Sequence, residues 1–270
     1  MNQPITDHYS QSLAPEQIIE QLQQHYPDGP TLYQLAPVDQ LHTGGIKASE
    51  RLLERLYGRP GCRVLDIGSG LGGLMRLAAE RIPCQMVGID ITHDFNTLNR
   101  QLSGLYDASR AQPALTADAQ TLPFADRSFD AVLFQHSLLN IPDKRATLNE
   151  CRRVLKPKGQ LILHELIEGP AYDQLRYPVP WARGAGLSHL MREAELRTLI
   201  EQAGFQINVL EDWSELAQNW RNRQREKEQQ PKQAPISPAL VLGPEFQQMA
   251  ANILHNLEIG AIRVVELVAR

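Results

Sequence analysis

Residues 64–73, with the sequence VLDIGSGLGG, constrain the fold of this chain more than any other segment. Val64, Leu65 and Ile67 predict a short buried strand, and four of the six residues that follow are glycines. Glycine permits a backbone with positive φ and lets a ligand lie directly against the main chain. The segment therefore predicts a strand, a tight turn and a helix beginning near Leu74, which together open a doubly wound α/β fold.

The glycine spacing alone does not identify the ligand. Gly68, Gly70 and Gly73 also fit the fingerprint of dinucleotide-binding proteins, which leaves a nicotinamide-dependent oxidoreductase as one alternative. Asp66 helps to separate the two cases. A carboxylate at that position would repel the pyrophosphate of a dinucleotide, whereas it favours the ammonium and sulfonium of S-adenosylmethionine. The acid predicts a methyl-donor site.

Later segments also place polar residues at strand ends. Residues 86–90 predict a second strand ending in Asp90, about 20 residues after the glycine turn, where an acid would hold a ribose diol. Asp118 follows a weak third strand and is expected to accept a hydrogen bond from an adenine amino group. Residues 129–136 predict a fourth strand that ends at His136. Ligands of open α/β sheets bind at this carboxyl edge, so these side chains are expected to meet there.

Residues 64–165 resemble the class I S-adenosylmethionine-dependent methyltransferases. A narrower similarity, to sarcosine/dimethylglycine-type N-methyltransferases of small molecules, rests on four outer motifs: LAPVDQLHTGG at 35–45, NIPDK at 140–144, YPVPW at 177–181 and GPEF at 243–246. The resemblance and the alternation of helices and strands predict a Rossmann-like sheet of seven strands. It is mostly parallel, with one antiparallel strand near the end of the chain and helices on both faces.

The resemblance implies S-adenosylmethionine as cofactor, S-adenosylhomocysteine as its product and an amine as the small acceptor of an in-line methyl transfer. The residues expected to hold the donor are Asp66, Gly68, Ser69, Gly70, Asp90, Ile91, Asp118, Ala119, Gln135 and His136. The expected catalytic residues are His136, as a donor contact or a base, and Asn140. Relatives of the phosphoethanolamine type carry an acid and a later histidine in this region, so their catalytic pair is not transferred to this chain.

Four residues are expected to bind the acceptor: Tyr33, His42, Tyr177 and Trp181. Tyr172, Tyr177 and Trp181 lie in a proline- and glycine-rich segment and are candidates for a cage around a methylated ammonium, or for packing that segment onto the domain. We expect this long loop to act as a lid. An alternative acceptor is apolar, such as a quinone or isoprenoid methylated on carbon or oxygen, with Leu138, Leu139, Trp181 and Leu187 lining its pocket. A module that binds the donor without turnover also remains open.

One domain is expected over residues 1–270, with an N-terminal helical cap (1–60), a donor-binding core (61–165), the lid loop (166–190) and a C-terminal part that completes the sheet (191–270). The net charge of −4 gives no reason to expect a nucleic-acid partner, and no apolar run approaches the roughly 18 residues of a membrane span. Cys62, Cys84 and Cys151 lack metal-type spacing and are expected to stay reduced in a cytoplasmic protein without a metal. The oligomeric state stays open, with a homodimer as one option.

Overall fold

The structure is a computed structural model and describes residues 3–11, 13–58, 60–230 and 235–270. Its centre is a seven-stranded sheet with the order β3-β2-β1-β4-β5-β7-β6. The first five strands pair in parallel, and β7 runs antiparallel to both β5 and β6, which confirms the predicted sheet. The strands are β1 (Arg63–Ile67), β2 (Gln85–Asp90), β3 (Ala114–Thr116), β4 (Phe129–Gln135), β5 (Leu155–Glu168), β6 (Ile207–Asp212) and β7 (Ile262–Ala269).

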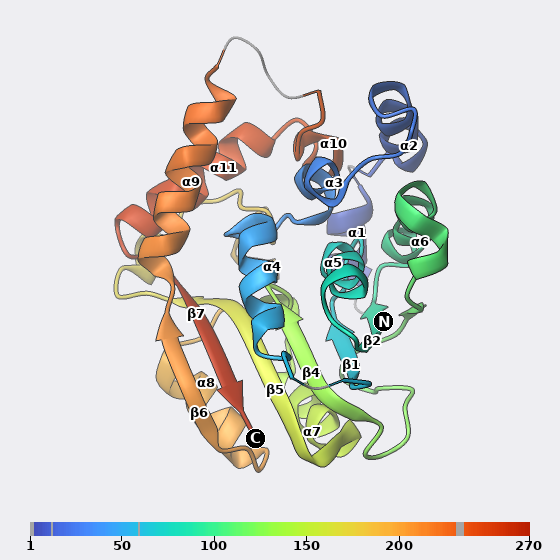
Figure 1. Cartoon of the computed structure of the whole chain (residues 1–270). Coiled ribbons are helices and arrows are strands. Elements are labelled where there is room, and N and C mark those ends of the chain that lie inside the picture. Colours follow the sequence, from blue (N-terminus) through green and yellow to red (C-terminus); the bar gives the residue numbers. More distant parts are fainter. Residues whose placement is uncertain (1–2, 12, 59, 231–234) are drawn as a thin grey trace.

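Helices cover both faces of this sheet (Figure 1). One face packs against α7 and α8, and the opposite face packs against α4 and α5. None of the described helices has the length and apolar character needed to cross a membrane. The helices are α1 (Gln3–Ser10), α2 (Pro15–His25), α3 (Leu32–Asp39), α4 (Gly45–Glu54), α5 (Gly73–Arg81), α6 (His93–Asp107), α7 (Lys144–Val154), α8 (Glu193–Gln202), α9 (Ser214–Glu228), α10 (Ala239–Leu242) and α11 (Phe246–Glu258), with short 3₁₀ turns η1 (Ala108–Arg110), η2 (Leu138–Asn140), η3 (Tyr172–Gln174) and η4 (Ala185–Leu187).

Residues 27–43, whose prolines and glycines argue against one regular element, contain the short helix α3 in their middle. A capping box starts it: the Thr31 hydroxyl accepts a hydrogen bond from the Gln34 backbone N–H at 3.3 Å, and the Gln34 side chain accepts one from the Thr31 N–H at 2.8 Å. Helix α3 lies with α1, α10 and α11 at the upper end of the sheet in Figure 1. Each of these four helices contributes residues to the cavity described below.

Strand β5 extends past residue 165, where the donor-binding core was expected to end. Its pairing with β4 ends at Gln135 and His164, but its pairing with the antiparallel β7 continues to Glu168 and Ile262. Strand β7 supplies backbone hydrogen bonds to β5 beyond the end of β4, so β5 continues to Glu168. Residues 166–168, which were expected to begin the lid loop, therefore belong to the sheet.

The expectation that Cys62 and Cys84 stay reduced is wrong for this structure, which joins them in a disulfide. Each cysteine stands immediately before one of two adjacent parallel strands, and the first pair in that ladder is Arg63 with Gln85. The pairing brings the two cysteine Cα atoms to 4.7 Å, within the normal range for a disulfide. A separation of 22 residues in the sequence does not reveal this proximity. Cys151 is free and buried.

Candidate active site

A cavity lies at the carboxyl edge of the sheet. We use two names for its lining. The strand-end lining follows β1, β2, β3 and β4 and comprises Asp66, Gly68, Ser69, Gly70, Asp90, Ile91, Thr92, Asp118, Ala119, Gln135 and His136. The aliphatic lining comes from α1, η2, the loop after β5 and the helices α10 and α11, and comprises Ile5, His8, Tyr9, Leu139, Asn140, Ile141, Pro142, Pro180, Trp181, Arg183, Val241, Leu242 and Met249.

The glycine turn passes close to its neighbours and needs residues without a side chain. Gly68 has φ +74°, and a Cβ there would collide with Ser137. Gly72 has φ +79°, and a Cβ there would collide with the side chain of Asn99. The backbone N–H groups of Gly68 and Ser69 donate to the Ile89 carbonyl at 2.8 and 3.0 Å, which ties the turn to the end of β2. The glycine turn is thus held in one conformation, and a ligand can bind directly against its backbone.

Two acids, Asp66 and Asp90, lie beside the glycine turn. Asp90 accepts hydrogen bonds from the Thr92 N–H at 2.8 Å and the Gly70 N–H at 3.0 Å. Asp66 is 2% exposed and accepts no hydrogen bond from the described residues. Burial, followed by the charge of Asp90, raises the pKa of Asp66 to about 7, and burial raises the pKa of Asp90 as well. Two acids in this position favour a ligand that brings positive charge and hydroxyl donors.

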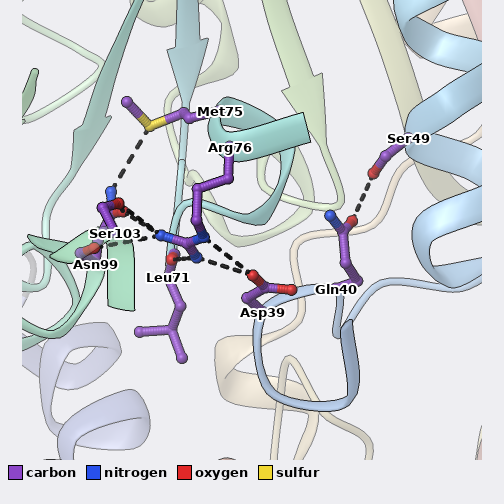
Figure 2. Close-up of polar contacts among 8 residues, drawn as sticks. All are labelled: Asp39, Gln40, Ser49, Leu71, Met75, Arg76, Asn99 and Ser103. Carbon is purple, nitrogen blue, oxygen red and sulfur yellow. Dashed lines mark hydrogen bonds and ion pairs between the residues drawn. The ribbon is translucent and has the colours of Figure 1, made fainter. Parts of the chain in front are cut away.

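A buried ion pair supports the turn from behind, as Figure 2 shows. The Arg76 guanidinium donates to Asp39 at 2.9 Å, to the side chains of Asn99 and Ser103 at 2.9 Å each, and to the Leu71 carbonyl. Arg76 and Asp39 have side chains 3% and 2% exposed. The network joins α3, α5 and α6. Asp39, from the N-terminal cap, thereby fixes the first turn of α5, the helix that follows the glycines.

The end of β4 has an unusual backbone. His136 has φ +53°, a conformation uncommon for residues other than glycine and often found at functional sites. Its backbone N–H donates to the His164 carbonyl at 2.9 Å, and the next two N–H groups, of Ser137 and Leu138, both donate to Glu165 at 2.8 Å. Burial raises the pKa of Glu165 to about 7, and the backbone N–H groups oppose that rise. These bonds hold the strained residue in place.

The His136 ring belongs to a residue that lines the cavity, and one of its nitrogens has no partner in the part of the chain that the structure describes. Its Nδ1 accepts a hydrogen bond from the Thr43 backbone N–H at 3.4 Å, and its Nε2 is buried without a partner among the described residues. Burial, then the nearby His164 and His42, holds the ring pKa well below its usual range, so the ring is neutral and its proton sits on Nε2. His136 is therefore suited to donate a hydrogen bond to a ligand oxygen.

No three His, Cys, Asp or Glu side chains in the described part of the chain could hold a metal ion.

Asn140, expected to be catalytic, has its amide group engaged within the protein. Its Nδ2 donates to the Trp181 carbonyl at 2.9 Å and to the Leu187 carbonyl at 3.2 Å, and its Oδ1 accepts from the Tyr9 hydroxyl at 2.7 Å. Both amide hydrogens thus connect η2 to the loop after β5, and the amide oxygen connects η2 to helix α1. This arrangement favours a structural role for Asn140 in place of the catalytic role expected from the sequence.

Most of the predicted site residues meet in the cavity. All ten expected donor contacts lie in the strand-end lining, His42 also lines the cavity, and Trp181 lies in the aliphatic lining. Tyr33 and Tyr177 do not line it. Tyr33 is 50% exposed and donates to Glu50 at 2.6 Å, because its place on α3 points it toward α4 rather than the sheet edge. Tyr177 packs with Tyr172 against a core cluster, so of the two alternatives for these aromatics the structure supports packing over a three-ring cage around the cavity.

The loop expected to be a lid is bonded to the rest of the fold at several points. Asn256 exchanges hydrogen bonds with the backbone of Arg176 at 2.9 and 3.0 Å, and Asn252 donates to the Pro178 carbonyl at 2.9 Å. Lys144 donates to the His189 carbonyl at 2.6 Å. Trp181 is 4% exposed. The loop resembles a fixed wall of the cavity more than a segment that opens freely.

Several residues of the cavity escape sequence reasoning. Helix α1 brings Ile5, His8 and Tyr9 to the lining, and α10 and α11 bring Val241 and Met249. These five residues lie at the two ends of the chain, in short amphipathic elements without a motif. Of the elements that carry them, only α11 is long enough for its amphipathic pattern to predict one buried helix face.

Comparisons with known proteins agree with this geometry. The methyltransferase-domain family profile matches residues 65–163. The chain is 31% identical, over 62% of its length and 77% of the relative's, to the ubiquinone/menaquinone biosynthesis C-methyltransferase UbiE of Paraburkholderia xenovorans. It is 32% identical to the glycine/sarcosine/dimethylglycine N-methyltransferase of Actinopolyspora halophila, over 43% of this chain but only 21% of that protein's length.

Among solved structures, the fold is similar to that of phosphoethanolamine N-methyltransferase 2 of Haemonchus contortus in complex with S-adenosyl-L-methionine. The TM-score is 0.71 at 19% identity, and the match covers 93% of this chain and 56% of the other. The family profile falls on the strands and turns that build the strand-end lining. Sequence, sheet order and relatives thus lead to one assignment: the chain belongs to the class I S-adenosylmethionine-dependent methyltransferases.

Proposed function

We propose that this enzyme transfers a methyl group from S-adenosylmethionine to a small acceptor with an apolar body, at an oxygen or carbon atom. The observation that carries the proposal is the chemistry of the aliphatic lining, which contains Ile5, Leu139, Ile141, Val241, Leu242 and Met249. An acceptor bound there exchanges water for apolar side chains, which stabilises an apolar molecule by about 25 cal/mol per Å² of surface buried.

An amine acceptor, the expectation from the sequence, finds less support in this lining. Among the described residues, the acids that line the cavity are Asp39, Asp66, Asp90 and Asp118, and none belongs to the aliphatic lining. The charged side chain of that lining is Arg183, which is paired with Glu245 at 3.3 Å. Of the three loop aromatics, only Trp181 reaches the cavity. Burying a cation there without a counter-charge is unfavourable.

The strand-end lining fits the cofactor. We expect Asp90 to accept hydrogen bonds from ribose hydroxyls, and we expect Asp66, on whose pKa no hydrogen bond acts, to pair with the ammonium group. Asp118 and Ile91 line the region expected for the adenine. When bound, S-adenosylmethionine supplies a methyl group on a sulfonium, which is a strong electrophile. The protein's part is to hold the acceptor in line with that methyl and to exclude water.

The test is a donor-turnover assay that measures S-adenosylhomocysteine formation over matched acceptors. One group contains phenols and reduced quinones of increasing apolar area, and the other contains sarcosine, dimethylglycine and phosphoethanolamine. We expect turnover with the first group and rising kcat/KM with apolar area. Turnover confined to the amines would contradict the proposal. Donor binding without turnover of any acceptor would favour a binding module.

A further inference from the structure

Helix α1 carries a histidine whose ring is held in one orientation by a backbone carbonyl of the loop after β5. The Nε2 atom of His8 lies 3.1 Å from the carbonyl oxygen of Pro180. A carbonyl only accepts hydrogen bonds, so Nε2 carries the proton and donates it. Pro180 belongs to the loop after β5, 172 residues away in the chain. The bond therefore fixes both the position and the tautomer of the ring.

The other nitrogen of this ring is free to accept a proton. His8 Nδ1 is buried and has no hydrogen-bond partner among the described residues, and His8 lines the cavity beside the aliphatic side chains. The charged groups that act on the ring are Arg183, which disfavours a positive charge on it, and Glu245, which favours one. Burial is the largest influence and lowers the ring pKa, so the ring is neutral near pH 7 and its Nδ1 lone pair is available.

His8 and His136 both line the cavity and are engaged at opposite ring nitrogens. Thr43 occupies Nδ1 of His136 and leaves a donor at Nε2, whereas Pro180 occupies Nε2 of His8 and leaves a lone pair at Nδ1; both free nitrogens are buried. A ring oriented by a carbonyl at one nitrogen and open at the other is the arrangement that general bases use. No other buried histidine nitrogen without a partner lines the cavity in the described part of the chain.

We propose that His8 is the base that removes the proton from a weakly acidic hydroxyl group of the acceptor. The inference rests on the proposed function and narrows the acceptor to an apolar molecule with a phenol- or enol-type hydroxyl. In this step the O–H bond breaks, the proton binds to Nδ1, and the electron pair stays on the oxygen as the nucleophile. The ring becomes an imidazolium that keeps its Nε2–H on the Pro180 carbonyl, and it later loses the extra proton to water.

His8→Gln tests the proposal, because the glutamine amide can still donate to the Pro180 carbonyl but has no basic atom. At pH 8 and saturating donor, we expect the variant to lower kcat with 1-naphthol about 100-fold. With 4-nitrophenol, which is already largely ionised at this pH, the loss should be less than about fivefold. S-adenosylhomocysteine affinity should not change. His25→Gln, the same substitution at an exposed histidine outside the cavity lining, should leave both rates unchanged.

Equal losses with the two phenols, or no loss with 1-naphthol, would overturn the assignment. Failure of the proposed function would show differently, as no wild-type turnover of either phenol. A second readout does not depend on turnover: ¹⁵N NMR of histidine-labelled protein bound to S-adenosylhomocysteine. We expect His8 Nδ1 to be unprotonated and its ¹⁵N resonance to shift, as it accepts a hydrogen bond, when 1-naphthol binds. Protonation before 1-naphthol is added, or no change on its binding, also overturns the proposal.

Discussion

The two linings of the cavity are built in different ways. The strand-end lining comes from residues 66–136, stands at the ends of hydrogen-bonded parallel strands and is rich in acids and backbone N–H groups. The aliphatic lining is drawn from residues 5–9, 139–142, 180–183 and 241–249 and is held by side-chain packing and a few cross-links such as Tyr9 with Asn140. The first fixes charges in place, and the second encloses an apolar space. This difference suits a constant donor on one side and a selected acceptor on the other.

The comparison predicts that the strand-end lining depends on the buried charge pair behind it. Arg76→Met should lower the free energy of unfolding by about 3–5 kcal/mol, because it leaves Asp39 as a buried carboxylate without a partner. Urea unfolding measures the change. Arg81→Met, on the same helix with a side chain 43% exposed, is the control and should cost less than about 1 kcal/mol. A loss below 1 kcal/mol for Arg76→Met would show that the network is not needed for stability.

Within the strand-end lining, Asp90→Ala should weaken the binding of S-adenosylhomocysteine about 100-fold. The carboxylate is placed to hold two ribose hydroxyls, and each charge-assisted hydrogen bond contributes about 1.5–3 kcal/mol. Calorimetry gives the affinity, and circular dichroism checks that the fold is retained. Asp90→Asn, which keeps one carbonyl oxygen, should lose less. An alanine variant with the wild-type affinity would remove Asp90 from the donor site.

A charge placed in the aliphatic lining should impair acceptor binding without changing donor binding. Leu242→Glu should raise KM for an apolar phenol about tenfold, since burying one such side chain against a ligand contributes about 1–2 kcal/mol. Donor affinity should stay within twofold. Leu242→Gln controls for shape without charge. If the glutamate variant instead gained activity on dimethylglycine while losing none on the phenol, the aliphatic lining would not select for apolar acceptors.

Donor affinity should also depend on pH. The pKa of Asp66 is raised to about 7, and the ammonium of the donor favours the ionised carboxylate. Above pH 7 the group is already ionised, whereas below pH 7 it must lose a proton on binding, so affinity falls by up to about tenfold per pH unit. Calorimetry with S-adenosylhomocysteine should therefore show about tenfold weaker binding at pH 6 than at pH 8. Asp66→Asn should bind weakly at both pH values; a wild-type pH slope in this variant would assign the titration to another group.

The smallest effect concerns which part of the aliphatic lining moves. The loop after β5 is bonded through Asn140, Lys144, Asn252 and Asn256, whereas side-chain hydrogen bonds from α1 to the cavity wall come from His8 and Tyr9. Hydrogen exchange should show the loop already protected in the free enzyme and α1 gaining protection when S-adenosylhomocysteine and a phenol bind. The reverse pattern would restore the loop as the lid.

The sequence alone determined the sheet, the donor chemistry and the residues of the strand-end lining other than Thr92. This was possible because those residues follow a local pattern: a buried strand, then a glycine or an acid, repeated at one edge of a parallel sheet. Asp66 and Asp90 could be assigned from their spacing. The sequence also predicted Tyr33 and Tyr177 in the acceptor site, but neither lines the cavity. An aromatic residue near a motif does not reveal the direction of its side chain.

Only the tertiary structure decided the acceptor side. It brought α1 against the loop after β5, gave His8 and His136 opposite free nitrogens, engaged Asn140 in structural bonds and paired Cys62 with Cys84. Each of these depends on contacts between segments far apart in the chain, and no local periodicity encodes such contacts. A tautomer in particular is set by the one atom that a ring nitrogen meets, which for His8 is a carbonyl 172 residues away.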